Sequence, residues 1–199
     1  KNLPFVTVQL PIYNEQNVIK DIINNLLKNF SNVIVINDGS NDKTLEIIND
    51  LDIKILSHEI NLGVGAAVQT GFDYVSDIPD AKAVITFDAD GQHLVDDAVA
   101  MAKEILICDE GIIFGTRFPK HSKNIPKVKR FVLKLIAKIT DLVTGVTLTD
   151  AHNGLKAYKI STIKELELQF SSYSYESELI TQVAKKKIDY KEMSTDIKY

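Results

Sequence analysis

Apolar residues in the first half of the chain follow two alternating spacings. In short runs such as FVTVQL (5–10) they are rich in β-branched types and recur at alternate positions, which is typical of strands. Similar runs predict strands at 32–37, 53–57, 83–87 and 111–115. Between them, a spacing of three or four predicts helices at 15–29, 45–51, 66–75 and 95–107. This alternation predicts an α/β fold with a mainly parallel central sheet and helices on both faces.

The pattern is less regular after Arg117. A loop to Pro126 is followed by a long helix expected at 127–143, and mixed elements continue to the end, including a short strand-like stretch after Gly154. No repeat, low-complexity tract or linker divides the 199 residues, so we expect one domain over 1–199. The chain starts at Lys1 rather than Met, and we expect it to be part of a longer protein.

Composition narrows the function classes. Hydrophobic residues make up 45% and charged residues 25% of the chain, as in ordinary globular proteins. A net charge of -4 argues against nucleic acid as the main partner. The single Cys108 excludes an internal disulfide framework and a cysteine zinc cluster, and it suggests a reducing compartment. The sequence shows no signal peptide or membrane span, so a cytoplasmic location is expected.

Polar clusters follow four of the predicted strands. They are PIYNE (11–15), NDGS (37–40), DADGQH (88–93) and GTRF (115–118). In an open parallel sheet, ligands bind in the crevice outside the carboxyl ends of the strands. The four clusters are therefore expected to meet in a single cleft.

Asp88 and Asp90 are the sharpest candidates for chemistry. Residues two apart on extended chain project to the same side, and two carboxylates suit Mg²⁺ or Mn²⁺ with positions left for phosphate oxygens and water. Gln92 could add a carbonyl oxygen. The alternative is an ordinary turn, because Asp and Gly are common turn residues. Their position directly after a buried strand favours a metal or diphosphate site.

The two earlier clusters have both ligand-binding and local interpretations. Asp38 could accept hydrogen bonds from a nucleobase edge, or NDG could be turn chemistry before a helix. Tyr13 could stack on a base and Glu15 could bind the base or a ribose hydroxyl, whereas Asn14 could simply cap a helix that starts at Glu15.

Glycines 63, 65 and 71 lie in NLGVGAAVQTGF (61–72), which lacks the Gly-Lys-Ser/Thr of a Walker A loop. They indicate either close backbone approach to a ligand or simple helix-start glycines.

The helix expected at 127–143 has a basic face beside an apolar one. Lys127, Arg130, Lys134 and Lys138 recur at intervals of three, four and four. This pattern is typical of an interfacial helix that contacts anionic lipid headgroups, and also of a surface helix with a solvated cationic edge. Arg117 could bind phosphate, and Asp150 or His152 could be a base or a satisfied turn residue.

With these motifs in this order, the chain resembles glycosyltransferase family 2, inverting enzymes with a Rossmann-like GT-A fold. It is most similar to the branch with dolichol-phosphate mannose synthase and bacterial polyprenyl-phosphate glycosyltransferases, which implies a bacterial enzyme of cell-envelope biogenesis. The resemblance implies that a UDP- or GDP-sugar binds at Pro11, Tyr13, Glu15, Asp38, Gly65, Asp88 and Ala89. It implies Mg²⁺ or Mn²⁺ at Asp88, Asp90 and Gln92. Acceptor-phosphate contacts would come from Arg117, Arg130 and Lys134, and catalytic roles would fall to Asp90, Asp150 and Arg117.

The chain also departs from the family pattern. It has no Trp, so the Gln-x-x-Arg-Trp signature of processive polysaccharide synthases is absent. Leu155-Lys156 stands where many members have an aromatic residue followed by Arg. This difference weakens any substrate inference from that loop.

The resulting expectation is sugar transfer to a polyprenyl or dolichyl phosphate at the cytoplasmic face of a membrane. The alternatives are transfer to a saccharide hydroxyl, with Asp150 as base, and a non-catalytic nucleotide-sugar binding module. A sugar-phosphate nucleotidyltransferase is disfavoured, because PIYNE is not a Gly-rich, Arg/Lys-bearing loop. The sequence does not reveal the oligomeric state.

Overall fold

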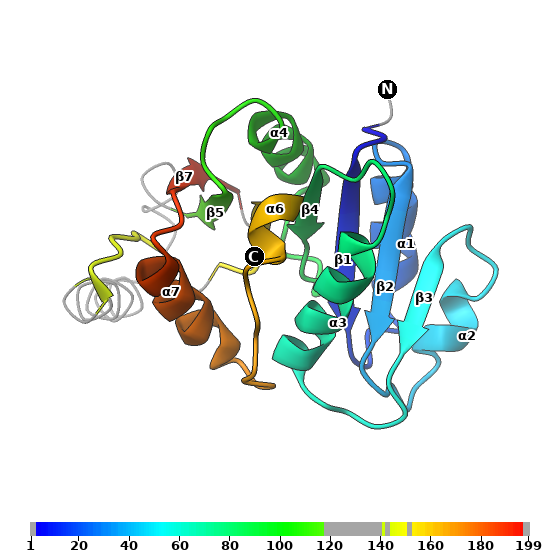
Figure 1. The fold of residues 1–199 in the computed structure, drawn as a ribbon. Coiled ribbons are helices and arrows are strands. Elements are labelled where there is room, and N and C mark those ends of the chain that lie inside the picture. Colours follow the sequence, from blue (N-terminus) through cyan, green and yellow to red (C-terminus); the bar gives the residue numbers. More distant parts are fainter. Residues whose placement is uncertain (1–2, 118–140, 142–143, 151–152, 197–199) are drawn as a thin grey trace.

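The computed structural model describes residues 3–117, 141, 144–150 and 153–196. A single seven-stranded sheet runs through it in the order β3-β2-β1-β4-β6-β5-β7 (Figure 1). All neighbouring strands are parallel except β6, which is antiparallel to both β4 and β5. The strands are β1 (Val6–Ile12), β2 (Asn32–Asn37), β3 (Lys54–Ser57), β4 (Ala83–Thr86), β5 (Ile112–Thr116), β6 (Lys156–Lys159) and β7 (Tyr190–Ser194).

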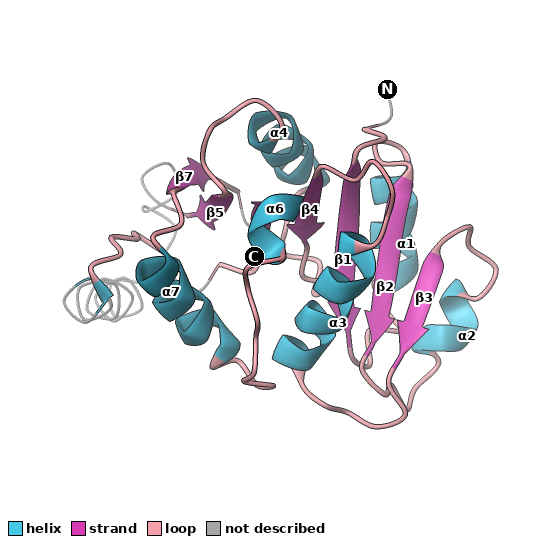
Figure 2. Cartoon of the chain, in the orientation of Figure 1, coloured by secondary structure: helices cyan, strands magenta, loops and turns pink. Residues whose placement is uncertain are grey.

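Helices cover both faces of this sheet (Figure 2). Buried residues of α1, α2 and α4 pack with one side of the sheet, and those of α3, α6 and α7 pack with the other. The helices are α1 (Ile19–Leu27), α2 (Thr44–Ile48), α3 (Val64–Ser76), α4 (Val95–Ile105), α6 (Ile160–Ile163) and α7 (Tyr175–Lys186). The predicted mainly parallel α/β architecture is confirmed.

The five predicted strands and the strand-like stretch after Gly154 are all present. Their alternation has a direct structural cause in β1, where Val6, Val8 and Leu10 enter one core while Thr7 and Gln9 project from the opposite side. The predicted helix at 127–143 lies outside the described residues, apart from Asp141. Within the described residues, no helix has the length and apolar character needed to cross a membrane.

The predicted start of the first helix was wrong. Helix α1 begins at Ile19 rather than at Glu15, and Asn14 does not cap it. Asn14 instead has a φ of 59°, in the left-handed region that Asn tolerates better than most residues. Its side chain is used in a contact between two loops, described below.

Gly71 sets the distance between α3 and the sheet. A Cβ at this position would overlap with the Oε1 atom of Gln9 on β1, so only glycine lets the helix approach this closely. Gln9 is fully buried, and its amide donates a 2.9 Å hydrogen bond to the Thr86 hydroxyl on β4. The close approach fixes the beginning of α3 beside the carboxyl ends of the central strands.

Candidate active site

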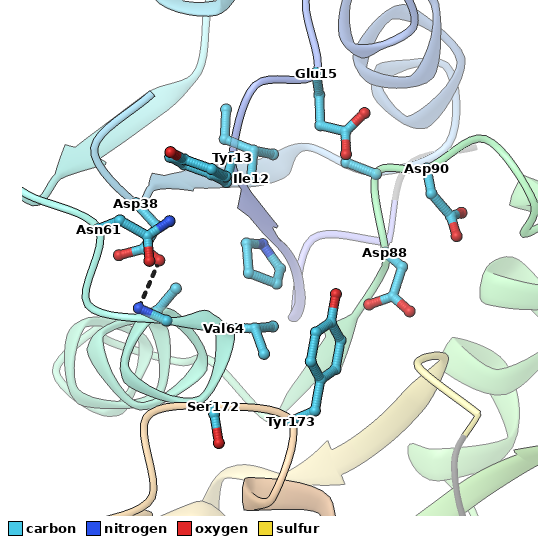
Figure 3. A pocket seen from close by; sticks show the side chains of 14 residues that line it. Ile12, Tyr13, Glu15, Asp38, Asn61, Val64, Asp88, Asp90, Ser172 and Tyr173 are labelled. Atoms are coloured by element: carbon cyan, nitrogen blue, oxygen red, sulfur yellow. Dashed lines mark hydrogen bonds between the residues drawn. The ribbon is translucent and has the colours of Figure 1, made fainter. Parts of the chain in front are cut away.

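A cavity of about 440 Å³ opens at the carboxyl ends of β1, β2 and β4 (Figure 3). Three of the four polar clusters that follow predicted strands contribute to it. The predicted residues that line it are Pro11, Tyr13, Glu15, Asp38, Asp88, Ala89 and Asp90. Ile12, Asn61, Gly63, Val64, Ala67, Ser172 and Tyr173 complete the lining. The strand-end argument therefore located the cleft. Its prediction for the fourth cluster was wrong, because the described residues of GTRF, Gly115 to Arg117, do not line the cavity, and the wall formed by later segments was missed.

Hydrogen bonds join the loop after β1 to the loop after β2. The Asn14 N–H donates to the Ser40 hydroxyl at 3.0 Å, and the side-chain Oδ1 of Asn14 accepts from the Asn41 N–H at 2.8 Å. The Glu15 N–H donates to the Thr44 hydroxyl at 2.9 Å. The Asn14 side chain is thus bonded to the loop after β2 and does not cap a helix. These bonds hold Tyr13 and Glu15 at the edge of the cavity.

Asp38 is buried and anchors the segment before α3. Its carboxylate accepts hydrogen bonds from the backbone N–H groups of Leu62 and Gly63 at 2.8 and 2.7 Å, and the Nδ1 atom of His58 lies 2.7 Å away. The turn that follows β2 relies on other residues. The Asn37 side chain accepts from Ser40 N, and Gly39 has a φ of 71°. Since a carboxylate can accept about four hydrogen bonds, Asp38 retains capacity for a ligand.

Asp90 lies in a turn that Asp88 directly precedes, and both residues line the cavity, so the turn and the cavity wall are formed by the same segment. Asp90 Oδ1 accepts a 2.9 Å hydrogen bond from the Gln92 N–H, and Gly91 has a φ of 79°. The Asp88 carboxylate rests against Gly154, where a Cβ would overlap with both of its oxygens. The His93 Nε2 atom lies 3.6 Å from Asp88 Oδ2.

The acidic side chains of the cavity fit a divalent cation. Burial raises the pKa of Glu15, and the nearby charges of Asp90 and Asp42 raise that pKa further. Acidic groups therefore repel one another along this rim, and a hard cation would relieve the repulsion. Within the described residues, no group of three or more acidic, His or Cys side chains forms a complete cage. Two carboxylates with open positions suit a metal shared with phosphate oxygens.

Gln92 and Gly65 do not line the cavity in the described part of the chain. Gln92 is exposed, and its backbone rather than its side chain contacts Asp90. Gly65 donates its backbone N–H to the Ser171 carbonyl at 2.8 Å. Their roles in metal and nucleotide-sugar binding remain predictions.

Arg117 and Asp150 form a two-point ion pair. Arg117 Nε and Nη2 lie 2.5 and 2.6 Å from the two carboxylate oxygens, and the Arg117 backbone N–H donates to Asp150 at 3.2 Å. Asp150 is buried, so the pair is well shielded from water. In this arrangement both oxygens are engaged by Arg117, which favours Asp150 as a residue that orients the guanidinium. Arg130, Lys134 and His152 lie outside the described residues.

Segment 168–174, which lies between α6 and α7 in the chain, forms one wall of the cavity. Sequence analysis did not assign it to the site. The segment crosses the start of α3 directly above Gly63 and Gly65, where Cβ atoms would overlap with the Ser171 and Phe170 carbonyls. The glycines stand at the start of α3, and they also permit close backbone approach, here to another segment of the same chain. Gly63 lines the cavity as well, so close approach to a ligand stays a prediction. The pair Gly63 and Gly65 at the start of a helix was the sequence signal that could have indicated the contact with segment 168–174.

Together, the fold and the acidic cleft define a GT-A type glycosyltransferase domain. The model of glycosyl transferase family 2 matches residues 7–167, and the chain belongs to this family.

A relative from Methanococcus voltae, named UDP-N-acetylglucosamine--dolichyl-phosphate N-acetylglucosaminyltransferase, is 33% identical over 92% of this chain and 82% of its own. An undecaprenyl-phosphate 4-deoxy-4-formamido-L-arabinose transferase from Shewanella sediminis is 26% identical over 83% of this chain and 51% of its own. These relatives come from an archaeon and a bacterium, so the similarity does not favour a bacterial source.

Solved structures share the fold across almost the whole chain. Glucosyl-3-phosphoglycerate synthase from Mycobacterium tuberculosis, in complex with UDP, superimposes with a TM-score of 0.72 at 15% identity, covering 98% of this chain and 72% of its own. The same enzyme has been crystallised with Mn²⁺, UDP and phosphoglyceric acid. Mannosyl-3-phosphoglycerate synthase from Rubrobacter xylanophilus gives a TM-score of 0.75 at 13% identity, covering 98% of this chain and 67% of its own.

Proposed function

We propose that this protein transfers a sugar from a UDP- or GDP-sugar to the phosphate of a polyprenyl or dolichyl lipid, with inversion at the anomeric carbon. The observation that carries the proposal is a single cavity lined by Tyr13, Asp38, Asp88 and Asp90 at the ends of three adjacent strands. Relatives named as dolichyl-phosphate and undecaprenyl-phosphate transferases support the lipid acceptor.

The donor would extend across the cavity from the β2 end to the β4 end. Asp38 has remaining acceptor capacity for the N–H edge of a base, and the ring of Tyr13 is 43% exposed at the rim, where a base could stack. Asp88 and Asp90 would hold Mg²⁺ or Mn²⁺ against the diphosphate. When bound there, the cation would neutralise the charge that develops on the departing nucleoside diphosphate.

The proposed reaction is one in-line displacement. An oxygen of the acceptor phosphate forms a bond to the anomeric carbon while the bond from that carbon to the diphosphate oxygen breaks, so the configuration inverts. A lipid phosphate is already anionic at neutral pH, so no side chain needs to remove a proton. Arg117, oriented by Asp150, would supply fixed positive charge for a phosphate.

Transfer to a saccharide hydroxyl is less well supported. That reaction needs a base, and the candidate Asp150 has both carboxylate oxygens engaged by Arg117. A non-catalytic binding module would not need paired carboxylates at the diphosphate position, yet both line the cavity.

We also propose that the protein acts at the cytoplasmic face of a membrane, with the basic segment 127–143 contacting anionic headgroups. Liposome flotation of the wild type and of a variant with Lys127, Arg130, Lys134 and Lys138 neutralised tests this contact. We expect the variant to lose binding to anionic vesicles, and equal binding would contradict the proposal.

The activity is tested with a panel of radiolabelled UDP- and GDP-sugars, polyprenyl phosphate and Mn²⁺. We expect label in the lipid fraction, loss of transfer in EDTA, and a loss of at least about 100-fold in Asp90→Asn, since charge stabilisation at the leaving group is a large catalytic term. Labelling of a saccharide instead would contradict the acceptor assignment. Full activity in EDTA would contradict the metal assignment.

A further inference from the structure

Tyr173 combines high exposure with a position in the cavity wall. Its surface is 81% exposed, although it lines the same cavity as Asp38, Asp88 and Asp90. Figure 3 shows the ring reaching between Val64 and Asp88 with its hydroxyl directed into the cavity. The family resemblance assigned no role to this residue, and no core packing accounts for its ring.

The backbone under Tyr173 is held from two sides. The Gln169 and Phe170 N–H groups donate to the Glu178 carboxylate on α7 at 3.0 and 2.9 Å. The Ser171 carbonyl accepts from Gly65 on α3, as described above, and the Leu168 N–H donates to the Gln69 side chain at 2.7 Å. The segment 168–174 thus presents an exposed ring from a fixed backbone, which is the arrangement that preorganises a binding contact.

The order of groups in a nucleotide sugar decides what this ring would meet. The donor is a base, a ribose, a diphosphate and a sugar joined in that order, so the sugar is attached next to the diphosphate and away from the base. With the base near Asp38 and the diphosphate near Asp88 and Asp90, the sugar falls next to these carboxylates. Figure 3 shows Tyr173 beside Asp88, between it and Val64, and away from Asp38.

The chemistry of the Tyr173 side chain fits this position. Its ring stands beside the Asp88 carboxylate at the wall of the cavity (Figure 3). A tyrosine at such a point offers an apolar ring face to the C–H groups of a pyranose and a hydroxyl that can hydrogen-bond its oxygens.

We propose that Tyr173 contacts the sugar of the nucleotide-sugar donor and contributes to the choice of sugar. This inference rests on the proposed function, because it needs the donor to lie with its base at Asp38. It adds a specificity-determining contact from the segment 168–174 to a site otherwise built from strand ends.

The test compares binding of a nucleoside diphosphate with binding of the matching nucleotide sugar, by calorimetry in Mn²⁺. The donor is the nucleotide sugar that the wild type binds most tightly in the panel. We expect Tyr173→Ala to weaken binding of the nucleotide sugar by about three- to tenfold, the range for one aromatic contact. Binding of the nucleoside diphosphate should stay within about twofold. Tyr173→Phe separates the contribution of the ring from that of the hydroxyl.

Phe170→Ala is the matched control. Phe170 is an exposed aromatic residue on the same segment, 57% exposed, but its side chain does not line the cavity. We expect it to leave both affinities unchanged. Equal weakening of both ligands by Tyr173→Ala, or no change in either, would overturn the assignment of Tyr173 alone. A wild-type protein that binds no nucleotide sugar would overturn the proposed function together with it.

Discussion

The position of Asp88 depends on a single glycine of another segment. Gly154 lies against the Asp88 carboxylate, and a Cβ there would overlap with it. We expect Gly154→Ala to displace the carboxylate and to raise the Mn²⁺ concentration needed for half-maximal transfer by about 10- to 100-fold, as for other residues that orient metal ligands. A Mn²⁺ titration of activity measures this, and excess Mn²⁺ should restore much of the rate. An unchanged midpoint in a variant with wild-type thermal unfolding would contradict it.

The ionisation of Glu15 at the cavity affects the free energy of unfolding. Because burial, Asp90 and Asp42 raise its pKa, the folded state holds the Glu15 proton more tightly than the unfolded chain does. Ionisation of Glu15 therefore lowers the free energy of unfolding as pH rises from the ordinary carboxylate pKa through the raised value, and the loss persists above it. We expect Glu15→Gln to be more stable than wild type near pH 7.

Thermal unfolding between pH 4 and pH 8 checks the sign of this effect. The advantage of Glu15→Gln should shrink as pH falls below the raised pKa and disappear below the ordinary carboxylate range. Glu59→Gln, at an exposed glutamate outside the cavity, serves as the control and should show no such trend. An advantage of Glu15→Gln that grows toward low pH would contradict the charge argument.

At the scale of secondary-structure elements, β6 and α7 are joined by a buried ion pair. Lys156 Nζ lies 2.9 Å from Glu176 Oε1, and the side chain of Lys156 is only 1% exposed. Burial alone lowers the pKa of Lys156, but Glu176, Tyr158 and Asp88 outweigh that effect and raise it. Lys156, part of the Leu155-Lys156 departure from the family pattern, thus belongs to a buried ion pair. Neither Leu155 nor Lys156 lines the cavity.

We expect Lys156→Met to lower the free energy of unfolding by about 3–5 kcal/mol, because it removes the cation that neutralises a buried carboxylate. Urea unfolding measures the change. The double variant Lys156→Met/Glu176→Leu should recover most of the loss, since two apolar side chains can replace a buried pair. A double variant less stable than Lys156→Met would contradict this account.

The elements were predictable to different degrees, for physical reasons. Most of strands β1 to β5 could be located because a strand covered on both faces is a short apolar run, rich in β-branched residues and bounded by polar ones. The start of α1 could not, because Asn14 and Glu15 bond to the loop after β2, a contact between distant parts of the chain. The place of segment 168–174 in the cavity wall could not be predicted for a similar reason. It depends on contacts with Gly63 and Gly65, which lie far from it in the sequence.

At the scale of the whole molecule, the cavity joins early and late parts of the chain. Its strand-end side comes from residues before 91, and its opposite wall comes from Ser172 and Tyr173. The strand-end side follows from the rule that ligands bind outside the carboxyl ends of parallel strands. Seven residues predicted for the site line the cavity on this side. The opposite wall is set by tertiary docking. A ligand that touches both sides should therefore stabilise the fold as a unit.

Binding of a diphosphate in this cavity predicts a metal-dependent rise in the melting temperature. A ligand that binds only the folded state at 100 times its Kd adds about 2.7 kcal/mol, which corresponds to about 5–10 °C for a domain of this size. We expect UDP or GDP with Mn²⁺ to give such a shift in a thermal unfolding scan and Mn²⁺ alone to give little. With two carboxylates and open positions, the cation needs the diphosphate to complete its coordination. The shift should vanish in EDTA and in Asp90→Asn, and a full shift in either would show that the diphosphate binds without the metal.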